Sequence, residues 1–180
     1  MWLRHSTTPY LMLGSLSQDF SQPEYIHVLI NPLPVYGLAI GIVGLVIALI
    51  QRSRSAQIAT LALVMLSGLV AWPTAHYGEA GYDRVLSMSD DQGQAWLKVH
   101  AHRVHQLVWS FYVLAAIAAV AILVPVKWPK TGTALSIITL LCACAVLGVG
   151  GYIAHAGGKI RHREFRNEPA PAVPEEDDGD

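Results

Sequence analysis

Histidine is the residue type in this chain with the greatest capacity for chemistry. An imidazole can ligate a metal ion or a haem iron, and its pKa lies close enough to neutrality to relay protons. The 180-residue sequence contains eight histidines, none of them in the interior of its four long apolar runs: His5, His27, His76, His100, His102, His105, His155 and His162.

Four of these histidines mark the ends of the apolar runs. His27 precedes the first run, His76 follows the second, His105 precedes the third and His155 ends the fourth. If each run crosses a membrane, each brings one imidazole to about the same depth. The histidine pattern therefore predicts a site at one membrane edge.

Two neutral imidazoles on facing helices can supply both axial ligands of a b-type haem held between apolar helices. We predict that two of His76, His105 and His155 provide these ligands. The sequence has no CxxCH motif, so covalent attachment of a c-type haem is not indicated.

A zinc or copper site is an alternative, with His27, His102 and Glu79 as candidate metal ligands. His102 and His105 are three residues apart, so they share a helical face and could both contribute. A third alternative is a structural role, because histidine rings commonly lie in the headgroup region of a membrane. We expect that role for the remaining histidines: His5, His100 and His162.

The elements that position these histidines are four predicted transmembrane helices, over residues 28–50, 56–74, 107–124 and 133–154. Each is near the roughly 20 apolar residues that cross a bilayer. Short connections make antiparallel neighbours, so we predict an all-α integral membrane protein, a four-helix up-down bundle. We also predict a partly helical extramembrane segment between spans two and three. Its expected start is Ser89, as the N-cap before Asp90 and Asp91.

We divide the chain into three predicted parts. Residues 1–27 form an N-terminal interfacial or extramembrane segment, residues 28–166 form the membrane domain, and residues 167–180 form a disordered tail. The tail sequence NEPAPAVPEEDDGD is rich in proline and acidic residues, a composition typical of disorder.

The connections define two unequal sides. Side B consists of the short loops 51–55 and 127–130, and side A holds both termini and residues 75–106. Side B carries four Lys or Arg residues and no acid, which favours a cytoplasmic position. Four bases after span four argue the opposite, but the first span usually dominates topology. We predict a bacterial cytoplasmic membrane protein with side A in the periplasm.

The composition narrows the function classes. A net charge of −1 gives no basic balance for binding nucleic acid. The sequence also lacks a P-loop, a G-x-S-x-G motif and an HExxH motif, so it indicates no catalytic residues and favours a role other than an enzyme.

Four segments carry a family resemblance: NPLPVYGLAIG from Asn31 to Gly41, SGLVAWPTAHYGEAGYD, AHRVHQL and GGYIAHAGGKI. They resemble a bacterial family of small four-span membrane proteins of unknown function, whose first span opens with a His-Pro-x-x-x-His-Phe-Pro-like motif. The resemblance covers residues 26–163 and implies a four-helix membrane fold, similar in layout to di-haem membrane cytochromes. Asn31 and Tyr36 stand where the family has histidines. A haem in this chain would then depend on the ligands predicted above.

These observations predict a haem-binding protein that passes electrons between a quinone or a soluble redox protein and another component. The alternative is a cofactor-free accessory subunit of a larger membrane complex. Its contacts would be glycine-rich helix faces, which allow close approach of helices in lipid.

Overall fold

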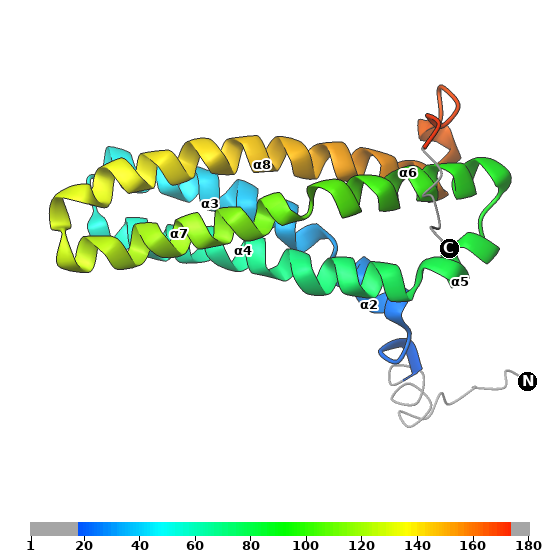
Figure 1. Ribbon diagram of the computed structural model, residues 1–180, viewed down its shortest axis with the longest axis horizontal. Helices are drawn as coiled ribbons and strands as arrows, with labels where there is room; N and C mark the ends of the chain where they lie inside the picture. The colour runs from blue at the N-terminus through cyan, green and yellow to red at the C-terminus, as the bar shows by residue number, and fades with distance from the viewer. Residues whose placement is uncertain (1–17, 174–180) are drawn as a thin grey trace, which may run out of the picture.

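The computed structural model describes residues 18–173, and these residues form helices and connecting turns without a strand. The predicted N-terminal segment lies outside the described residues up to position 17, as does the end of the predicted tail, 174–180. The described helices are α2 Pro23–Ile30, α3 Pro32–Ile50, α4 Arg54–Ala80, α5 Tyr82–Ser87, α6 Asp91–Leu107, α7 Trp109–Lys127, η1 Pro129–Thr131, α8 Gly132–Arg161 and η2 Arg163–Phe165 (Figure 1).

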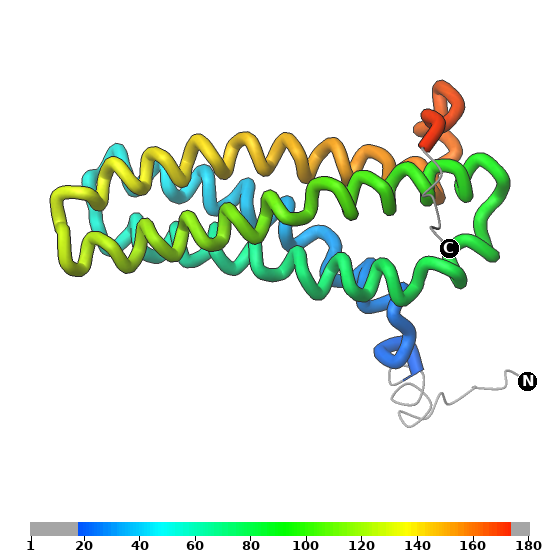
Figure 2. Tube along the Cα trace, in the orientation of Figure 1, coloured from blue at the N-terminus to red at the C-terminus, as the bar shows by residue number. Residues whose placement is uncertain are grey.

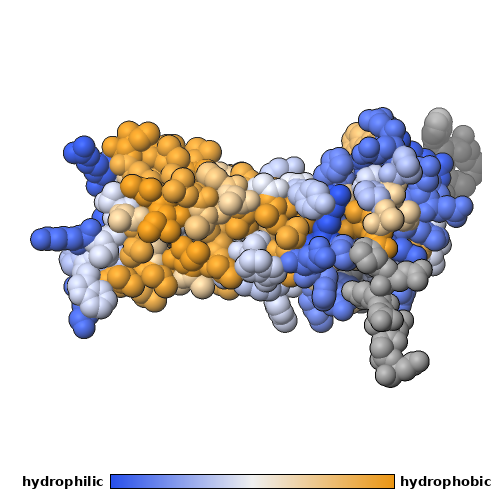
Figure 3. Space-filling view, turned by 45° about the horizontal axis from the view of Figure 1, so that its top comes forward, coloured by the Kyte–Doolittle hydropathy of each residue, from blue (hydrophilic) through white to orange (hydrophobic). Residues whose placement is uncertain are grey.

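Four helical stretches are long and apolar enough to cross a membrane: Pro23–Ile50, Arg54–Ala80, Asp91–Lys127 and Pro129–Arg161. On the face that Figure 3 shows, apolar residues cover the part of the molecule where these four stretches run together, and polar residues predominate at both ends. The prediction of an all-helical, multi-pass membrane protein is confirmed.

The membrane part is a ring of contacts in which α3 packs on α4, α4 on α7, α7 on α8 and α8 on α3. Its core is apolar and includes Leu38, Val64, Leu114 and Ala118. Small residues allow the helix backbones to approach closely. A Cβ built on Gly41 would lie 2.8 Å from the Val64 side chain, so α3 and α4 could not pack this closely around a larger residue.

Exposed aromatic side chains mark the membrane boundary on side A. Tyr36, Trp72, Trp109 and Tyr152, one from each helix of the ring, are each more than half exposed. Aromatic rings prefer the headgroup level. From Tyr152 to Thr133, near the other end of α8, the helix is about 28 Å long at a rise of about 1.5 Å per residue. That length matches a hydrocarbon core of roughly 30 Å. The 17-residue helix α6 therefore projects beyond the membrane.

A polar network closes the side B end of the bundle. Pro125 in α7 has no N–H, so the carbonyl of Ala121 lacks its usual helical partner. Arg54 donates to that carbonyl through Nη2 at 2.8 Å. Arg54 also donates to Oε1 of the buried Gln57, which accepts from the Ser136 hydroxyl at 3.1 Å. Each buried polar group in this network has a partner.

The projecting helices are longer than the predicted spans. Pro73 lies inside α4, which continues to Ala80, and α8 continues through Gly157 and Gly158 to Arg161. Helix α6 begins one residue later than predicted. Asp90, not Ser89, is its N-cap, because the Asp90 carboxylate accepts from the Gly93 N–H at 2.7 Å.

Arg166 joins the start of α6 to the end of α8. Its guanidinium donates to the carbonyls of Lys159 and Ile160 at 2.7 and 2.6 Å, and to Asp90 Oδ1 at 2.8 Å. These hydrogen bonds satisfy carbonyls that the last turn of a helix leaves unpaired. Within the part of the predicted tail that the structure describes, Ala170 and Val173 pack against a small apolar core around Trp96.

Candidate functional site

A large cavity lies on side A, where the bundle separates into two helix pairs. One pair is α2 with α4, and the other is α6 with α8 (Figure 2). The cavity has a volume of about 1590 Å³ and is lined by residues of both pairs, of α5 and of the segment 170–173. It exceeds the roughly 300–1,000 Å³ of a typical ligand pocket. The cavity can therefore hold a ligand of substantial size.

His27 extends into this cavity from α2. Its Nδ1 lies 2.8 Å from the carbonyl oxygen of Thr74 on α4. Because a carbonyl can only accept, Nδ1 donates and carries the ring proton in the neutral imidazole. Nε2 then carries the free lone pair. Gly78 gives the ring its space, since a Cβ at that position would lie 2.9 Å from ring atoms of His27.

His100 has the same arrangement on the opposite wall. Its Nδ1 lies 3.1 Å from the carbonyl oxygen of Ile153, across the contact between α6 and α8. Gly157, one turn further along α8, lies beneath the ring, and a Cβ there would lie 3.2 Å from ring atoms. His100 is thereby fixed with Nε2 as its free acceptor.

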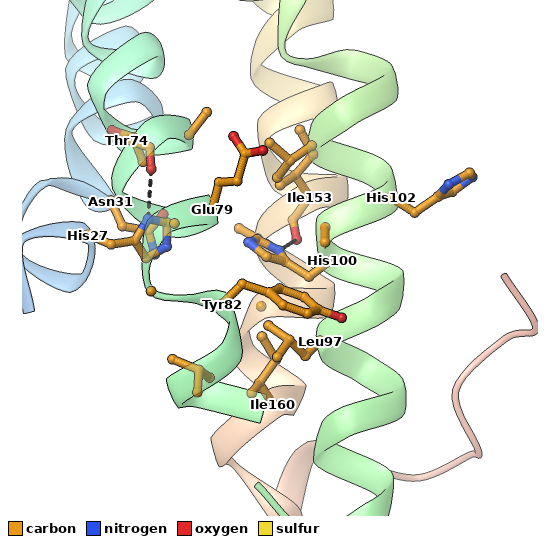
Figure 4. Close-up of a pocket in the computed structure, with 18 of the residues that line it drawn as sticks. His27, Asn31, Thr74, Glu79, Tyr82, Leu97, His100, His102, Ile153 and Ile160 are labelled. Carbon is orange, nitrogen blue, oxygen red and sulfur yellow. Dashed lines mark hydrogen bonds between the residues drawn. The ribbon is translucent and has the colours of Figure 1, made fainter. Parts of the chain in front are cut away.

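Figure 4 shows the two imidazoles on opposite walls of the cavity, with open space between them. In each, a backbone carbonyl sets the tautomer and orients the ring, as commonly found for metal-ligating histidines. Two fixed imidazole nitrogens from different helices could ligate a metal ion or a haem iron.

No family model, curated protein or solved structure matches this chain.

The predicted haem ligands do not come together in the structure. His76 is exposed and stacks on Trp72, with 5.7 Å between ring centroids. His155 is exposed and lies edge-on to Trp96, beside a separate hollow of about 380 Å³. His105 does line the main cavity, but its side chain is exposed.

The direction of each residue about its helix axis explains why the predicted haem ligands do not come together. His76 is two residues from Thr74 and His155 is two residues from Ile153, so each lies on nearly the opposite face of its helix from the carbonyl that lines the site. Each side chain therefore points away from that carbonyl.

The three predicted metal ligands, His27, His102 and Glu79, all line the cavity. Figure 4 shows Glu79 extending from α4 into the space between the walls, whereas the His102 ring points away from His27 and His100. Across residues 18–173, no three His, Cys, Asp or Glu side chains gather closely enough to hold a metal ion. The predicted trio is therefore not assembled in this arrangement.

His100 is a candidate site residue for which the sequence predicted only an interfacial role. The available signal was the placement of glycines: Gly78 and Gly157 lie in the sequence beside the predicted membrane edge. In the structure both are helical, and both provide space for an imidazole.

Tyr82 adds a polar group to the outer part of the cavity, below the imidazoles in Figure 4. Burial, together with the negative charge of Asp83, raises the pKa of Tyr82 above its usual value. The phenol therefore stays protonated at neutral pH and can donate a hydrogen bond to a ligand.

Proposed function

We propose that this chain is a membrane protein that binds b-type haem and takes part in electron transfer, with His27 and His100 as the axial ligands. The observation that carries the proposal is the pair of opposed imidazoles, each with Nδ1 bound to a backbone carbonyl on a neighbouring helix.

The residues present fit a haem on three counts. The donors are two neutral imidazoles, Gly78 and Gly157 leave room for the rings in fixed positions, and the cavity between the walls is large. A haem held there would supply a one-electron redox centre. The chain's own contribution is to orient the rings, to hold their Nδ1 protons on the carbonyls of Thr74 and Ile153, and to keep Nε2 available.

We further propose that the four membrane helices form an up-down bundle in a bacterial cytoplasmic membrane, with side B in the cytoplasm. The exposed Arg52, Lys127 and Lys130 support this orientation, because cytoplasmic loops are enriched in bases. The histidine pair would then lie at the periplasmic edge. There it could exchange electrons with a quinone in the membrane or with a soluble redox protein.

The proposal is tested by a reduced-minus-oxidised absorption spectrum of the protein, purified in detergent from haem-replete cells. We expect the Soret and visible bands of a six-coordinate, low-spin haem. A flat Soret region would contradict haem binding.

An accessory-subunit role is a second candidate, and the outer face of α8 favours it. A Cβ built on Gly148 or Gly151 would meet nothing within 4 Å, whereas glycines in α3, such as Gly41, already contact α4. The two outward glycines could receive a helix of another subunit. Stoichiometric co-purification of a membrane partner without a haem spectrum would support this role. A detergent monomer would contradict it.

A further inference from the structure

The cavity changes in character from its membrane end to its aqueous end. Its inner lining is apolar: Pro34, Val35, Ala71, Val108, Phe111 and Gly150. The two imidazoles follow at the level of Thr74 and Ile153. Basic side chains lie beyond them, further from the membrane.

Each wall of the cavity carries one arginine, about one helical turn further from the membrane than the histidine of the same wall. On the first wall, Glu24 lies three residues before His27 on α2, and its carboxylate accepts from Arg84 Nε at 2.9 Å. On the second wall, Arg161 lies four residues beyond Gly157, the glycine beneath His100. Residues three or four apart share a helical face. Each arginine is therefore placed outward from one of the imidazoles.

Within residues 18–173, both guanidinium groups keep unused donors. Arg84 uses Nε for Glu24, which leaves its two terminal nitrogens without a partner among those residues, and its side chain is 56% exposed. Among the same residues, Arg161 donates only a long hydrogen bond, 3.4 Å from Nη1 to the Met88 carbonyl. Besides Glu24, Glu79 is the other acid among the described residues that line the cavity. It directly follows Gly78, so it lies at the level of the imidazoles and closer to the membrane than the two arginines.

We propose that Arg84 and Arg161 bind the two carboxylates of a tetrapyrrole, so that its apolar edge faces the membrane end of the cavity. Haem carries both propionates on one edge, and arginine pairs with carboxylates in bidentate geometry. The inference rests on the proposed haem site. It adds the orientation of the ligand and the residues that recognise its charge.

Iron-free porphyrin separates this inference from axial ligation, because it has the same carboxylates and no iron. Protoporphyrin IX and its dimethyl ester would be titrated into the purified haem-free protein in detergent, and binding followed by porphyrin fluorescence. The wild type is expected to prefer the diacid. Each single variant, R84Q or R161Q, should weaken diacid binding by roughly three- to tenfold, and R84Q/R161Q should abolish the preference over the ester.

Two controls keep the test specific. R52Q removes an exposed guanidinium at the opposite end of the molecule, and it should leave the preference intact. H27A/H100A removes the iron ligands, and it should also retain the preference. Equal binding of diacid and ester by the wild type, or a preference that survives in R84Q/R161Q, would overturn the inference. Failure of the proposed function would instead appear as a missing low-spin spectrum with iron-containing haem.

Discussion

Gly78 on α4 lies directly beneath the imidazole of His27, so close that a Cβ on the glycine would be 2.9 Å from Cε1 and Nδ1 of the ring. Real Cβ atoms do not approach other atoms this closely, so any side chain at position 78 must displace the imidazole. The glycine and the backbone carbonyl of Thr74 together fix the ring from two directions.

Replacing Gly78 with alanine should therefore weaken haem binding, because the ring of His27 must move away from its position. We expect about a tenfold increase in Kd, measured by haem titration of the purified protein, since even small misplacement of a ligand is costly. G148A is the matched control, because a Cβ at Gly148 meets nothing within 4 Å. Equal Kd values for G78A and G148A would contradict the role assigned to Gly78.

The junction of α6 and α8 should loosen in acid. The hydrogen bond from the Gly93 N–H, followed by the interaction with Arg166, lowers the pKa of Asp90 below its usual value. A carboxyl group with a lowered folded-state pKa stabilises the fold above its unfolded pKa, and the contribution is lost as the pH falls through the folded pKa. Once corrected for the intrinsic rate of each amide, which itself falls in acid, hydrogen exchange at the start of α6 should accelerate over that acidic range.

D90N provides the comparison for this pH effect. The amide cannot ionise, so exchange at the start of α6 should already be faster at neutral pH, and it should lose its dependence on acid. An acid-dependent increase of equal size in D90N would show that another group controls the junction.

Substitutions of two neighbouring arginines at side B should have different effects on the free energy of unfolding. In R54M the Ala121 carbonyl loses its donor, which should lower the free energy of unfolding by about 1–3 kcal/mol. R52M should change it little, because Arg52 is exposed. Unfolding in mixed detergent micelles would provide the measurement.

Pro125 allows a sharper version of that test. P125A restores an N–H that can pair with the Ala121 carbonyl, so R54M should cost less in the P125A background than in the wild type. If the changes in free energy of unfolding caused by R54M and P125A simply add in the double variant, Arg54 does not compensate for the N–H that Pro125 lacks.

The membrane helices could be predicted from the sequence because apolar runs of this length have few other structures available to them. The position of each histidine along its helix also followed from the ends of those runs. Rotation about each helix axis did not, since it depends on contacts between helices that are distant in sequence. His76 and His100 show the difference: the predicted ligand points outward, and the residue assigned an interfacial role lines the cavity.

The position of α6 explains why His100 in particular was missed. Its ring acquires a role only when α6 packs on α8 and meets Ile153 and Gly157, more than fifty residues away. That packing is held by Arg166, which follows α8 and joins it to Asp90 at the start of α6.

The most direct test of the central claim is imidazole rescue of the two ligand positions. H27G and H100G would be reconstituted with ferric haem and their absorption spectra recorded with and without added imidazole, beside H76A and H155A. We predict a low-spin spectrum for the wild type, H76A and H155A. H27G and H100G should lose that spectrum, and free imidazole should restore it. A wild-type low-spin spectrum in both H27G and H100G without imidazole, or its loss in H76A or H155A, would contradict ligation by His27 and His100.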